Sequence, residues 1–369
     1  MFAPPATTSP PARRTTPQLS RSSSASTLSA VPTTPPNAPI ELPPPPSKPH
    51  VCRDLTGAAV NRPIKALLTP ALSQKDRPLR IVGLLATSDK GCEMYADMTA
   101  RACQSAGVDF QRLDLRSASS STEDGRFAAV LSAIKALNDD DSVDGLLVYL
   151  PLFGARRDAE LRAAISPRID VEGVSPASLA RSYATPPPPL EAVFRDPGPA
   201  MATAYPYPCT AAAVLRTLSH ASVPASGTVT IINRSETVGR PLAAMLANCG
   251  ATVYSVDVTG VQLWQTISSG LSIEDIDTPL PLLLAQSDAV VSAVPGSYTV
   301  PTQSLKMGTV CIDLSAEGNF APDVRERAGV FAPRIGAVTI SMLMCNALVL
   351  RRRAESGEGS VRWSGSDVA

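Results

Sequence analysis

The sequence predicts two α/β domains, the second of which is expected to be a Rossmann-like dinucleotide-binding domain. Three observations support this fold class. Apolar runs typical of buried strands alternate with helical segments from residue 79 to 166, and again from residue 228 to 333. A Pro-rich stretch at 184–208 separates the two series and is expected to be a surface loop. The 369 residues suffice for two hydrophobic cores.

The first series begins with the strand-like run LRIVGLLA at 79–86, followed by a helical segment at 91–107 that ends on Gly107. The other expected elements are a strand at 109–115, a helix at 126–140, a strand at 143–152 and a short helix at 160–166. Strands that alternate with helices predict a parallel sheet covered by helices on both faces.

The second series follows a helix at 209–221 and has the same rhythm. Its expected elements are a strand at 228–233, a helix at 240–250, a strand at 251–257, a helix and strand within 282–296, and strands at 309–315 and 329–333. A closing helix at 339–356 has arginines in its last turns, where the helix dipole favours cations.

These patterns divide the chain into a tail at 1–47, a first domain at 48–203, a Rossmann-like domain at 204–337 and a flexible tail at 354–369. The closing helix, at 338–353 in this division, is assigned to the first domain. The N-terminal tail is rich in Pro, Ser and Thr without apolar periodicity, so we expect disorder. Its arginines, with no acidic residue before Glu41, make a mitochondrial transit peptide the alternative interpretation.

Composition excludes several function classes. With 33 basic and 33 acidic residues, the chain has no electrostatic reason to bind nucleic acid or an anionic membrane. Its apolar runs are too short to span a bilayer. The seven cysteines are isolated, without metal-ligand spacing, which predicts a reduced, cytoplasmic protein with no metal. Only His50 and His220 are histidines, so any chemistry is expected to proceed without imidazole.

The stretch INRSETVGRP at 232–241 joins a strand to a helix, as phosphate-binding turns do. Asn233 stands where such turns often have glycine, and Gly239 permits close approach of a phosphate. Asp257 ends the next strand, 18 residues after Gly239 (257 minus 239), close to the spacing of about 20 for the acid that binds the ribose of NAD. An ordinary strand–turn–helix connection is the alternative.

Six motifs in order resemble the methylenetetrahydrofolate dehydrogenase/cyclohydrolase family. NRSETVGRPLAAMLANCGATV resembles its cofactor signature, and EMYADMTARACQSAG resembles the helix that carries its substrate tyrosine. The other four are VDGLLVYLPL, IDVEGVSP, YPCTAAAVLRTL and GAVTISMLMCNAL. The similarity covers about residues 48–353 and is greatest to the monofunctional, NAD-dependent members.

This resemblance implies that the protein oxidises 5,10-methylenetetrahydrofolate to 5,10-methenyltetrahydrofolate in one-carbon metabolism, with NAD as cofactor and a homodimer as its assembly. The folate nitrogens expel the hydride, so no general base is required. The work of the protein is then to position the methylene carbon against the nicotinamide.

The resemblance also implies the site residues. Tyr95 and Glu172 match the catalytic residues, Tyr95 by stacking on the aminobenzoyl group and Glu172 by binding the N–H donors of the pterin. The further residues assigned to the substrate site are Thr99, Tyr149, Pro333, Gly336 and Thr339. Those assigned to the cofactor site are Asn233, Arg234, Ser235, Gly239, Asp257, Val258, Ala293, Val294 and Pro295.

Two departures from the family pattern predict that cyclohydrolase activity is absent. Bifunctional members have a lysine where this chain has Thr99, and a glutamine where it has Tyr149. These are the two residues associated with hydrolysis of the methenyl product. The alternatives are a bifunctional enzyme with a rearranged second site, and a catalytically silent regulator that binds folate or nucleotide.

Overall fold

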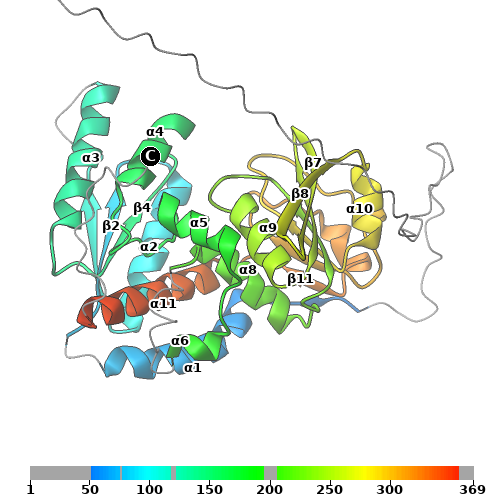
Figure 1. The fold of residues 1–369 in the computed structure, drawn as a ribbon, viewed down its shortest axis with the longest axis horizontal. Coiled ribbons are helices and arrows are strands. Elements are labelled where there is room, and N and C mark those ends of the chain that lie inside the picture. Colours follow the sequence, from blue (N-terminus) through cyan, green and yellow to red (C-terminus); the bar gives the residue numbers. More distant parts are fainter. Residues whose placement is uncertain (1–50, 75–76, 118–121, 195–205, 357–369) are drawn as a thin grey trace, which may run out of the picture. The chain divides into compact units, whose positions relative to one another are not determined.

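The computed structural model describes residues 51–74, 77–117, 122–194 and 206–356, whose elements are drawn in Figure 1. The chain divides into two compact units, and every described residue lies in the second, Pro46–Ala369. The predicted N-terminal tail at 1–47 lies outside the described residues. The same holds for residues 195–205 of the predicted loop and 357–369 of the predicted C-terminal tail.

A three-stranded parallel sheet in the order β3–β2–β4 forms the centre of the first domain. Its strands are β2 (Arg80–Leu85), β3 (Asp109–Asp114) and β4 (Gly145–Val148). The helices of this half of the chain are α1 (Gly57–Ser73), α2 (Lys90–Ser105), α3 (Glu123–Asn138), α4 (Ala155–Ala164), α5 (Pro176–Ala184) and α6 (Leu190–Phe194).

Side chains of β2 alternate between two hydrophobic cores, as the pleat of a strand requires. Ile81 and Leu85 belong to the core that includes the buried residues of α2, whereas Leu84 belongs to the core that includes Ile134 of α3 and Leu161 of α4. Both faces of the sheet are therefore covered, and the predicted α/β architecture is confirmed.

An eight-stranded sheet forms the second domain, in the order β1–β11–β10–β9–β5–β6–β7–β8. Its strands are β1 (Arg53–Asp54), β5 (Thr228–Ile232), β6 (Thr252–Asp257), β7 (Gly260–Ile267), β8 (Gly270–Ile276), β9 (Ala289–Ser292), β10 (Val310–Asp313) and β11 (Val330–Ala332). The connecting helices are α8 (Cys209–His220), α9 (Gly239–Asn248) and α10 (Leu280–Gln286), with 3-10 helices at Thr302–Ser304 and Pro322–Glu326.

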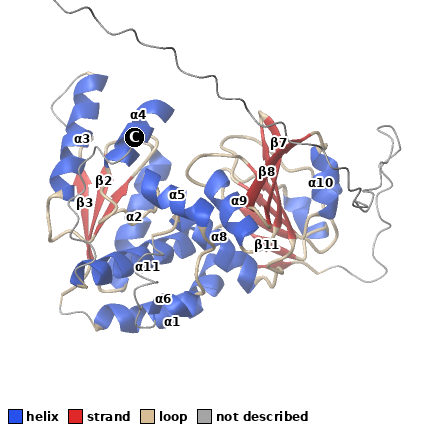
Figure 2. Ribbon diagram, in the orientation of Figure 1, coloured by secondary structure: helices blue, strands red, loops and turns tan. Residues whose placement is uncertain are grey.

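The strand order confirms the Rossmann-like prediction. Strand β5 pairs in parallel with β6 on one side and with β9 on the other, so the order of the strands reverses at β5. In open α/β sheets, ligands bind outside the carboxyl ends of the strands at such a switch point. Figure 2 shows the strands of the two sheets as separate groups, each flanked by helices.

The hairpin of β7 and β8 was not predicted from the sequence. Its strands are antiparallel and extend the sheet beyond β6, where a third parallel strand is usual in this fold. Trp264 of β7 is 1% exposed and packs against Tyr183 of α5, with ring centroids 5.9 Å apart. Helices α1 and α5 were also not predicted, and α6 lies within the predicted loop at 184–208.

Helix α11 (Gly336–Glu355) confirms the predicted closing helix and returns to the first domain. It packs against α1 and α8, as Figure 1 shows. The buried amide of Asn346 donates to Val171 O and Tyr207 O, both at 2.8 Å. Near the end of the helix, Arg351 forms an ion pair with Asp144 at 2.9 Å. The helix therefore ties together segments that are distant in sequence.

Side-chain caps mark several helix beginnings, in agreement with the preference for Ser, Thr and Asp at this position. The Asp89 carboxylate accepts a hydrogen bond from Cys92 N–H at 2.9 Å and so fixes the first turn of α2. Thr122 caps α3 and Ser175 caps α5 in the same way. None of the helices in the described ranges is both long enough and apolar enough to cross a bilayer.

Candidate active site

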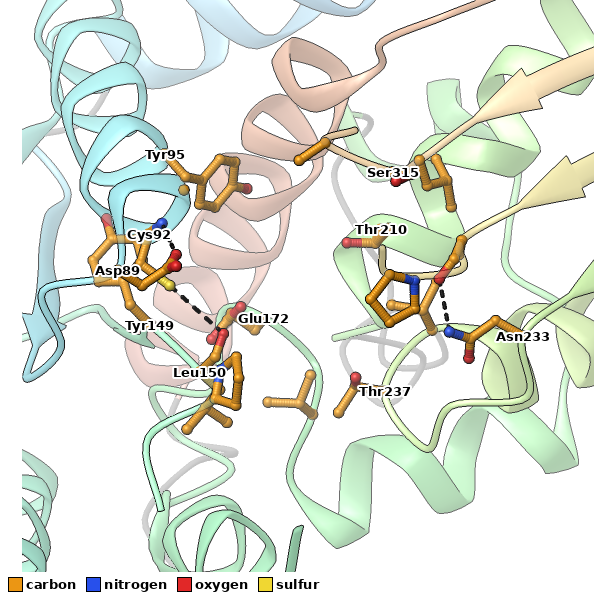
Figure 3. A pocket seen from close by; sticks show the side chains of 18 of the residues that line it. Asp89, Cys92, Tyr95, Tyr149, Leu150, Glu172, Thr210, Asn233, Thr237 and Ser315 are labelled. Atoms are coloured by element: carbon orange, nitrogen blue, oxygen red, sulfur yellow. Dashed lines mark hydrogen bonds between the residues drawn. The ribbon is translucent and has the colours of Figure 1, made fainter. Parts of the chain in front are cut away.

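One cavity of about 620 Å³ is lined by residues from both domains. From the first domain come residues of α2, the end of β4 and the segment around Glu172. From the second come the turn after β5 and the segments that follow β9 and β10, all at the carboxyl ends of parallel strands. Figure 3 shows Tyr95 and Glu172 facing Thr210, Asn233 and Ser315 across this cavity.

Helix α2 presents Tyr95 to the cavity from its second turn. The ring meets the ring of Tyr149 edge to face, with centroids 6.2 Å apart and planes at 81°. Burial, together with the proximity of Cys209 and Glu172, raises the pKa of the Tyr95 hydroxyl well above its ordinary value. Tyr95 is therefore neutral at physiological pH, and its ring is available as an apolar surface for a flat ligand.

Glu172 lines the same cavity and accepts a hydrogen bond from Val148 N–H at 3.2 Å. Burial raises the pKa of this carboxyl to about 8, and the nearby charge of Asp170 acts in the same direction. The charge of Arg162 lowers the pKa of this carboxyl only in part, so Glu172 is a candidate partner for a ligand that supplies hydrogen-bond donors.

Asp170 has a structural role two residues earlier. Its carboxylate accepts hydrogen bonds from the N–H groups of Val174 and Ser175, at 3.1 and 2.9 Å, and from the hydroxyl of Ser178 at 2.7 Å. It is 0% exposed. These contacts fix the loop that carries Glu172, so the two acids of the IDVEG motif are used differently.

Thr99 and Tyr149 present no polar group to the cavity centre. The Thr99 hydroxyl is buried and donates to Tyr95 O at 2.8 Å within α2, so Thr99 does not line the cavity. Tyr149 lines it, but its hydroxyl end lies over Gly83 of β2, 3.1 Å from where a Cβ atom would stand on that glycine.

The predicted loop near the folate lies outside the cavity wall. Pro333 follows β11, and Gly336 begins α11, where a Cβ atom would stand 3.0 Å from Cε of Met98. Thr339 is buried in the first turns of that helix. None of Pro333, Gly336 and Thr339 lines the cavity, and their assignment to the substrate stays a prediction.

The turn after β5 has the tight geometry of a phosphate-binding loop. Asn233 has φ of 99°, its Nδ2 donates to Ala293 O at 2.7 Å, and its Oδ1 accepts from Ser235 N–H at 2.8 Å. A Cβ atom at Gly239 would lie 2.0 Å from Asn233 O, so only glycine fits there. The hydroxyl of Ser235 accepts from Gly239 N–H at 3.3 Å. Asn233 thus bridges the ends of β5 and β9, at the switch point.

The Arg234 side chain does not point along this turn. Its guanidinium donates to Ser255 O and Gly260 O at 2.7 Å each, and to the hydroxyls of Ser255 and Thr259 at 3.1 and 3.3 Å. These acceptors belong to β6 and the start of the β7–β8 hairpin. Burial lowers the pKa of the guanidinium. The hydrogen-bond donors of the Arg234 guanidinium are therefore used to hold the start of the hairpin, which was not predicted from the sequence.

Asp257 ends β6 with its carboxylate turned toward the turn after β5. It accepts hydrogen bonds from Arg234 N–H and Val258 N–H, both at 2.7 Å. Val258 is fully exposed, and neither residue lines the main cavity. The carboxylate is thus held beside the nucleotide turn, where the ribose hydroxyls of a dinucleotide bind in Rossmann folds.

Ala293, Val294 and Pro295 follow β9 and line the cavity, and the buried Asn319 holds this segment in place. Asn319 Oδ1 accepts from Val294 N–H at 2.9 Å and from the Ser292 hydroxyl at 2.8 Å. Its Nδ2 donates to Val294 O and Tyr298 O at 3.0 and 3.2 Å. The sequence analysis missed Asn319, because its four hydrogen bonds go to residues far away in the sequence.

Further lining residues were also missed. Cys92 and Cys209 are both thiols of the wall, and burial raises the pKa of Cys92 to about 11, so it is protonated at neutral pH. The remaining polar members are Asp89, Thr210, Thr237, Ser315 and Glu317. Their common signal is a position at a helix beginning or just beyond a strand. No three His, Cys, Asp or Glu residues in the described ranges are grouped to hold a metal ion.

These observations fit a dinucleotide at the second-domain side of the cavity. Gly239 lets the turn fold tightly onto Asn233 O, and α9 begins at that glycine, so the turn places a helix N-terminus at the carboxyl end of β5, where a phosphate is expected. Asp257 suits the ribose, and Val294 and Pro295 offer an apolar wall for a nicotinamide ring.

Two family models match the chain. The catalytic domain of tetrahydrofolate dehydrogenase/cyclohydrolase matches residues 55–172, and the NAD(P)-binding domain of the same family matches residues 208–355. Together they cover most of the described residues.

Curated relatives and a solved structure agree with these models. An NAD(+)-dependent methylenetetrahydrofolate dehydrogenase of Schizosaccharomyces pombe is 32% identical, over 82% of this chain and 93% of the relative. That of Saccharomyces cerevisiae is 36% identical, over 74% and 87%. The solved structure of the NAD-dependent 5,10-methylenetetrahydrofolate dehydrogenase from Saccharomyces cerevisiae superposes with a TM-score of 0.71 at 30% identity, covering 84% of this chain and 99% of that one.

Proposed function

The chain belongs to the tetrahydrofolate dehydrogenase/cyclohydrolase family, and we propose that it oxidises 5,10-methylenetetrahydrofolate to 5,10-methenyltetrahydrofolate with NAD, without hydrolysing the product. It is an oxidoreductase of the NAD-dependent methylenetetrahydrofolate dehydrogenase type. The absence of cyclohydrolase activity and the roles of individual residues are the finer parts of the proposal.

One observation supports the proposal most directly. The two residues assigned to the folate, Tyr95 and Glu172, open into the same cavity as Asn233, Val294 and Pro295, which are assigned to the cofactor. Hydride transfer requires donor and acceptor carbons in contact, so both ligands must share one enclosed space. A protein that bound only one of them would not need such a joint cavity.

Bound NAD supplies the hydride acceptor. The protein contributes binding, orientation and exclusion of water. The Glu172 carboxylate accepts the pterin donors, the Tyr95 ring packs on the aminobenzoyl group, and the apolar wall at Val294 and Pro295 keeps solvent away from the reacting carbon.

The charge of the wall suits the product. Of the described residues that line the cavity, three are carboxylic acids, namely Asp89, Glu172 and Glu317, and none is Lys, Arg or His. The folate changes from neutral to cationic at its reacting centre during oxidation. Carboxylates near a developing cation stabilise it more than they stabilise the neutral substrate. The wall therefore stabilises the positive charge that develops at the reacting carbon, the more so as Glu172 becomes ionised.

The residues at positions 99 and 149 support a monofunctional enzyme. Hydrolysis of the methenyl cation needs a water activated near the bridging carbon and a group that manages protons. The Thr99 hydroxyl is bonded back to its own helix, and the Tyr149 hydroxyl end lies over Gly83. Neither side chain offers a base or an amide to the cavity, so we propose that the methenyl product leaves without being hydrolysed.

The nucleotide side supports NAD over NADP. Asp257 stands beside the turn, and a 2′-phosphate there would meet its negative charge. Arg234 donates its backbone N–H to Asp257, but its guanidinium is engaged by four acceptors of β6 and the start of the hairpin. Binding a phosphate would require breaking those hydrogen bonds.

The proposal is tested by incubating the full-length protein with NAD and 5,10-methylenetetrahydrofolate and following NADH. We expect turnover that depends on both compounds and decreases strongly on Glu172→Gln. Absence of NADH formation by folded protein that still binds either ligand would instead support a silent regulator. Rapid loss of the methenyl product beyond its decay in buffer would support the bifunctional alternative.

We further propose that the protein is a homodimer, on the basis of its family. We also propose that it is cytoplasmic, because the structure described here joins none of the seven cysteines in a disulfide. Light scattering of the purified protein tests the assembly. Imaging of the full-length chain, compared with one that lacks residues 1–46, tests the location and whether the tail directs it.

A further inference from the structure

Gly83 occupies an unfavourable place for a glycine. It lies in the middle of β2, the central strand of the first sheet, paired with Arg112 of β3 on one side and Leu147 of β4 on the other. Glycine inside a strand loses more conformational entropy on folding than other residues, and it often marks a close approach of another group. Gly83 is not among the glycines with positive φ, so the backbone does not explain it.

Two aromatic rings fill the space in front of Gly83. A Cβ atom there would lie 2.5 Å from Cζ of Phe110, and 3.1 Å from both Cε2 and the hydroxyl oxygen of Tyr149. Phe110 comes from β3, and Tyr149 follows β4, with its N–H bonded to Leu84 O of β2 at 3.1 Å. The two rings therefore converge over β2 from its two neighbours, and only the missing side chain makes room for them.

We propose that Gly83 is a positioning residue for folate oxidation, which acts through Tyr149 on the shape of the folate end of the cavity. The Tyr149 ring is 3% exposed and is lodged over Gly83, and its edge-to-face contact with Tyr95 links it to the ring assigned to the substrate. The functional part of this inference rests on the proposed oxidation of methylenetetrahydrofolate.

The direction in which Tyr149 would be displaced follows from its surroundings. On one side the ring is bounded by the sheet, and on the other by α2, where Ala96 and Thr99 are completely buried. The remaining open side is the cavity, which Tyr149 already lines. A methyl group at position 83 would therefore push the phenol toward Tyr95 and the folate site, since packed interiors have no other free volume.

Gly83 also bears on the pair at positions 99 and 149. A glutamine in place of Tyr149 is smaller than the phenol and would leave empty volume over Gly83. If Thr99 and Tyr149 were replaced by the lysine and glutamine of bifunctional relatives, a larger residue at position 83 would also be needed to fill the volume that the phenol leaves.

The test is a double-substitution cycle between Gly83→Ala and Tyr149→Gln in a Phe110→Leu background, which removes the ring atom nearest to position 83. With Tyr149 present, Gly83→Ala should raise KM for methylenetetrahydrofolate roughly fivefold or more, as expected for residues in contact. KM for NAD should change less than about twofold. With Tyr149→Gln, the same substitution should change neither KM by more than about twofold.

Gly145 of β4 provides the matched control, because a Cβ atom there would lie 2.2 Å from Cγ1 of Val171, away from both rings. Gly145→Ala should lower the melting temperature equally whether or not Tyr149→Gln is present. An effect of Gly83→Ala on the folate KM that is the same with and without Tyr149→Gln would overturn the proposal, because Gly83 would then act only as a strand residue.

Thermal unfolding keeps the inference testable if a variant folds poorly or if the chain proves not to oxidise methylenetetrahydrofolate. In the Phe110→Leu background, Gly83→Ala should lower the melting temperature when Tyr149 is present, and should raise it or leave it unchanged when Tyr149→Gln has emptied the space. This change of sign requires no catalysis. A decrease of equal size in both backgrounds would refute the contact between Gly83 and Tyr149.

Discussion

Replacing Glu172 by Gln should abolish the pH dependence of folate use. The carboxyl lies in the cavity, where burial, followed by the charge of Asp170, raises its pKa to about 8. The pterin of the proposed substrate offers N–H donors, which bind an ionised carboxylate more strongly than a protonated one. The unmodified enzyme should therefore bind its substrate better as the pH rises through about 8.

The size of this effect follows from the pKa. At pH 7 a carboxyl with a pKa near 8 is ionised in about one molecule in ten. If the substrate binds only the ionised form, its apparent binding is weaker by about 1.4 kcal/mol than at high pH. At pH 9 the carboxyl is almost fully ionised. kcat/KM for methylenetetrahydrofolate, which reports ionisations of the free enzyme, should consequently rise about tenfold between these two pH values.

The assay measures initial rates of NADH formation at saturating NAD over about pH 6 to 10. Glu172→Gln should give a flat profile, with kcat/KM lower by about 30- to 1000-fold at high pH, equivalent to about 2–4 kcal/mol for a lost charge-assisted site. Glu317→Gln is the matched control, because it neutralises another carboxylate of the same wall and should preserve the rise. A flat profile in the unmodified enzyme, or an unchanged rise in Glu172→Gln, would refute the reasoning.

The same pKa predicts a pH dependence of folding. A carboxyl whose pKa is raised from its ordinary 4.5 to about 8 is more easily protonated in the folded state than in the unfolded one. Its contribution to stability is fully present below about pH 4.5 and is lost as the pH rises through about 8. Relative to Glu172→Gln, the unmodified protein should therefore lose thermal stability across this window, which unfolding at several pH values measures.

Three further predictions concern the other parts of the site. NAD should be preferred over NADP by up to about 100-fold, because repulsion between a 2′-phosphate and Asp257 is on the order of 4 kcal/mol before solvent screening. Asp257→Asn should reduce this preference, because it removes the repulsion of the 2′-phosphate and weakens the hydrogen bonds to the ribose hydroxyls of NAD; an unchanged ratio of kcat/KM for the two cofactors would refute the role of Asp257. Methenyltetrahydrofolate should decay in the presence of the protein no faster than in buffer, which its absorbance measures. A tenfold or greater acceleration, equivalent to a barrier lowered by about 1.4 kcal/mol or more, would show that the enzyme is bifunctional. Asn319→Ala should lower the free energy of unfolding by about 2–4 kcal/mol and raise KM for NAD more than KM for the folate, because it leaves buried backbone groups unpaired. Equal effects on both KM values would count against its role at the nicotinamide wall.

Much of the fold was predictable because its signals are local. The strand at 79–86, the turn at 232–241 and the closing helix each carry their pattern within one stretch of chain, and each was confirmed with small shifts of its ends. The β7–β8 hairpin was missed because its residues are half-exposed and lack the continuous apolar run of the parallel strands. Edge strands that are partly solvated give a weaker signal than buried ones.

The residues assigned to the site from the sequence were those that stand inside motifs. Tyr95, Glu172, Asn233 and Val294 line one cavity, as a shared active site requires, although their contacts with ligands stay predictions. Asn319 had no motif to mark it. Its importance arises from four hydrogen bonds to a segment more than twenty residues earlier in the chain, and no local pattern encodes such a contact.

The sequence by itself determined the α/β class, the family and the strand–turn–helix at 232–241, because strand runs and turn residues act on the backbone around them. Only the tertiary structure decided where side chains point. Arg234 stands in the turn predicted to bind the nucleotide, yet its guanidinium binds the start of the hairpin. Tyr149 lines the cavity, yet the end of its ring lies over Gly83. The direction of a side chain depends on which distant segment supplies a free volume or an acceptor, and strands that are neighbours in the sheet bring those segments together.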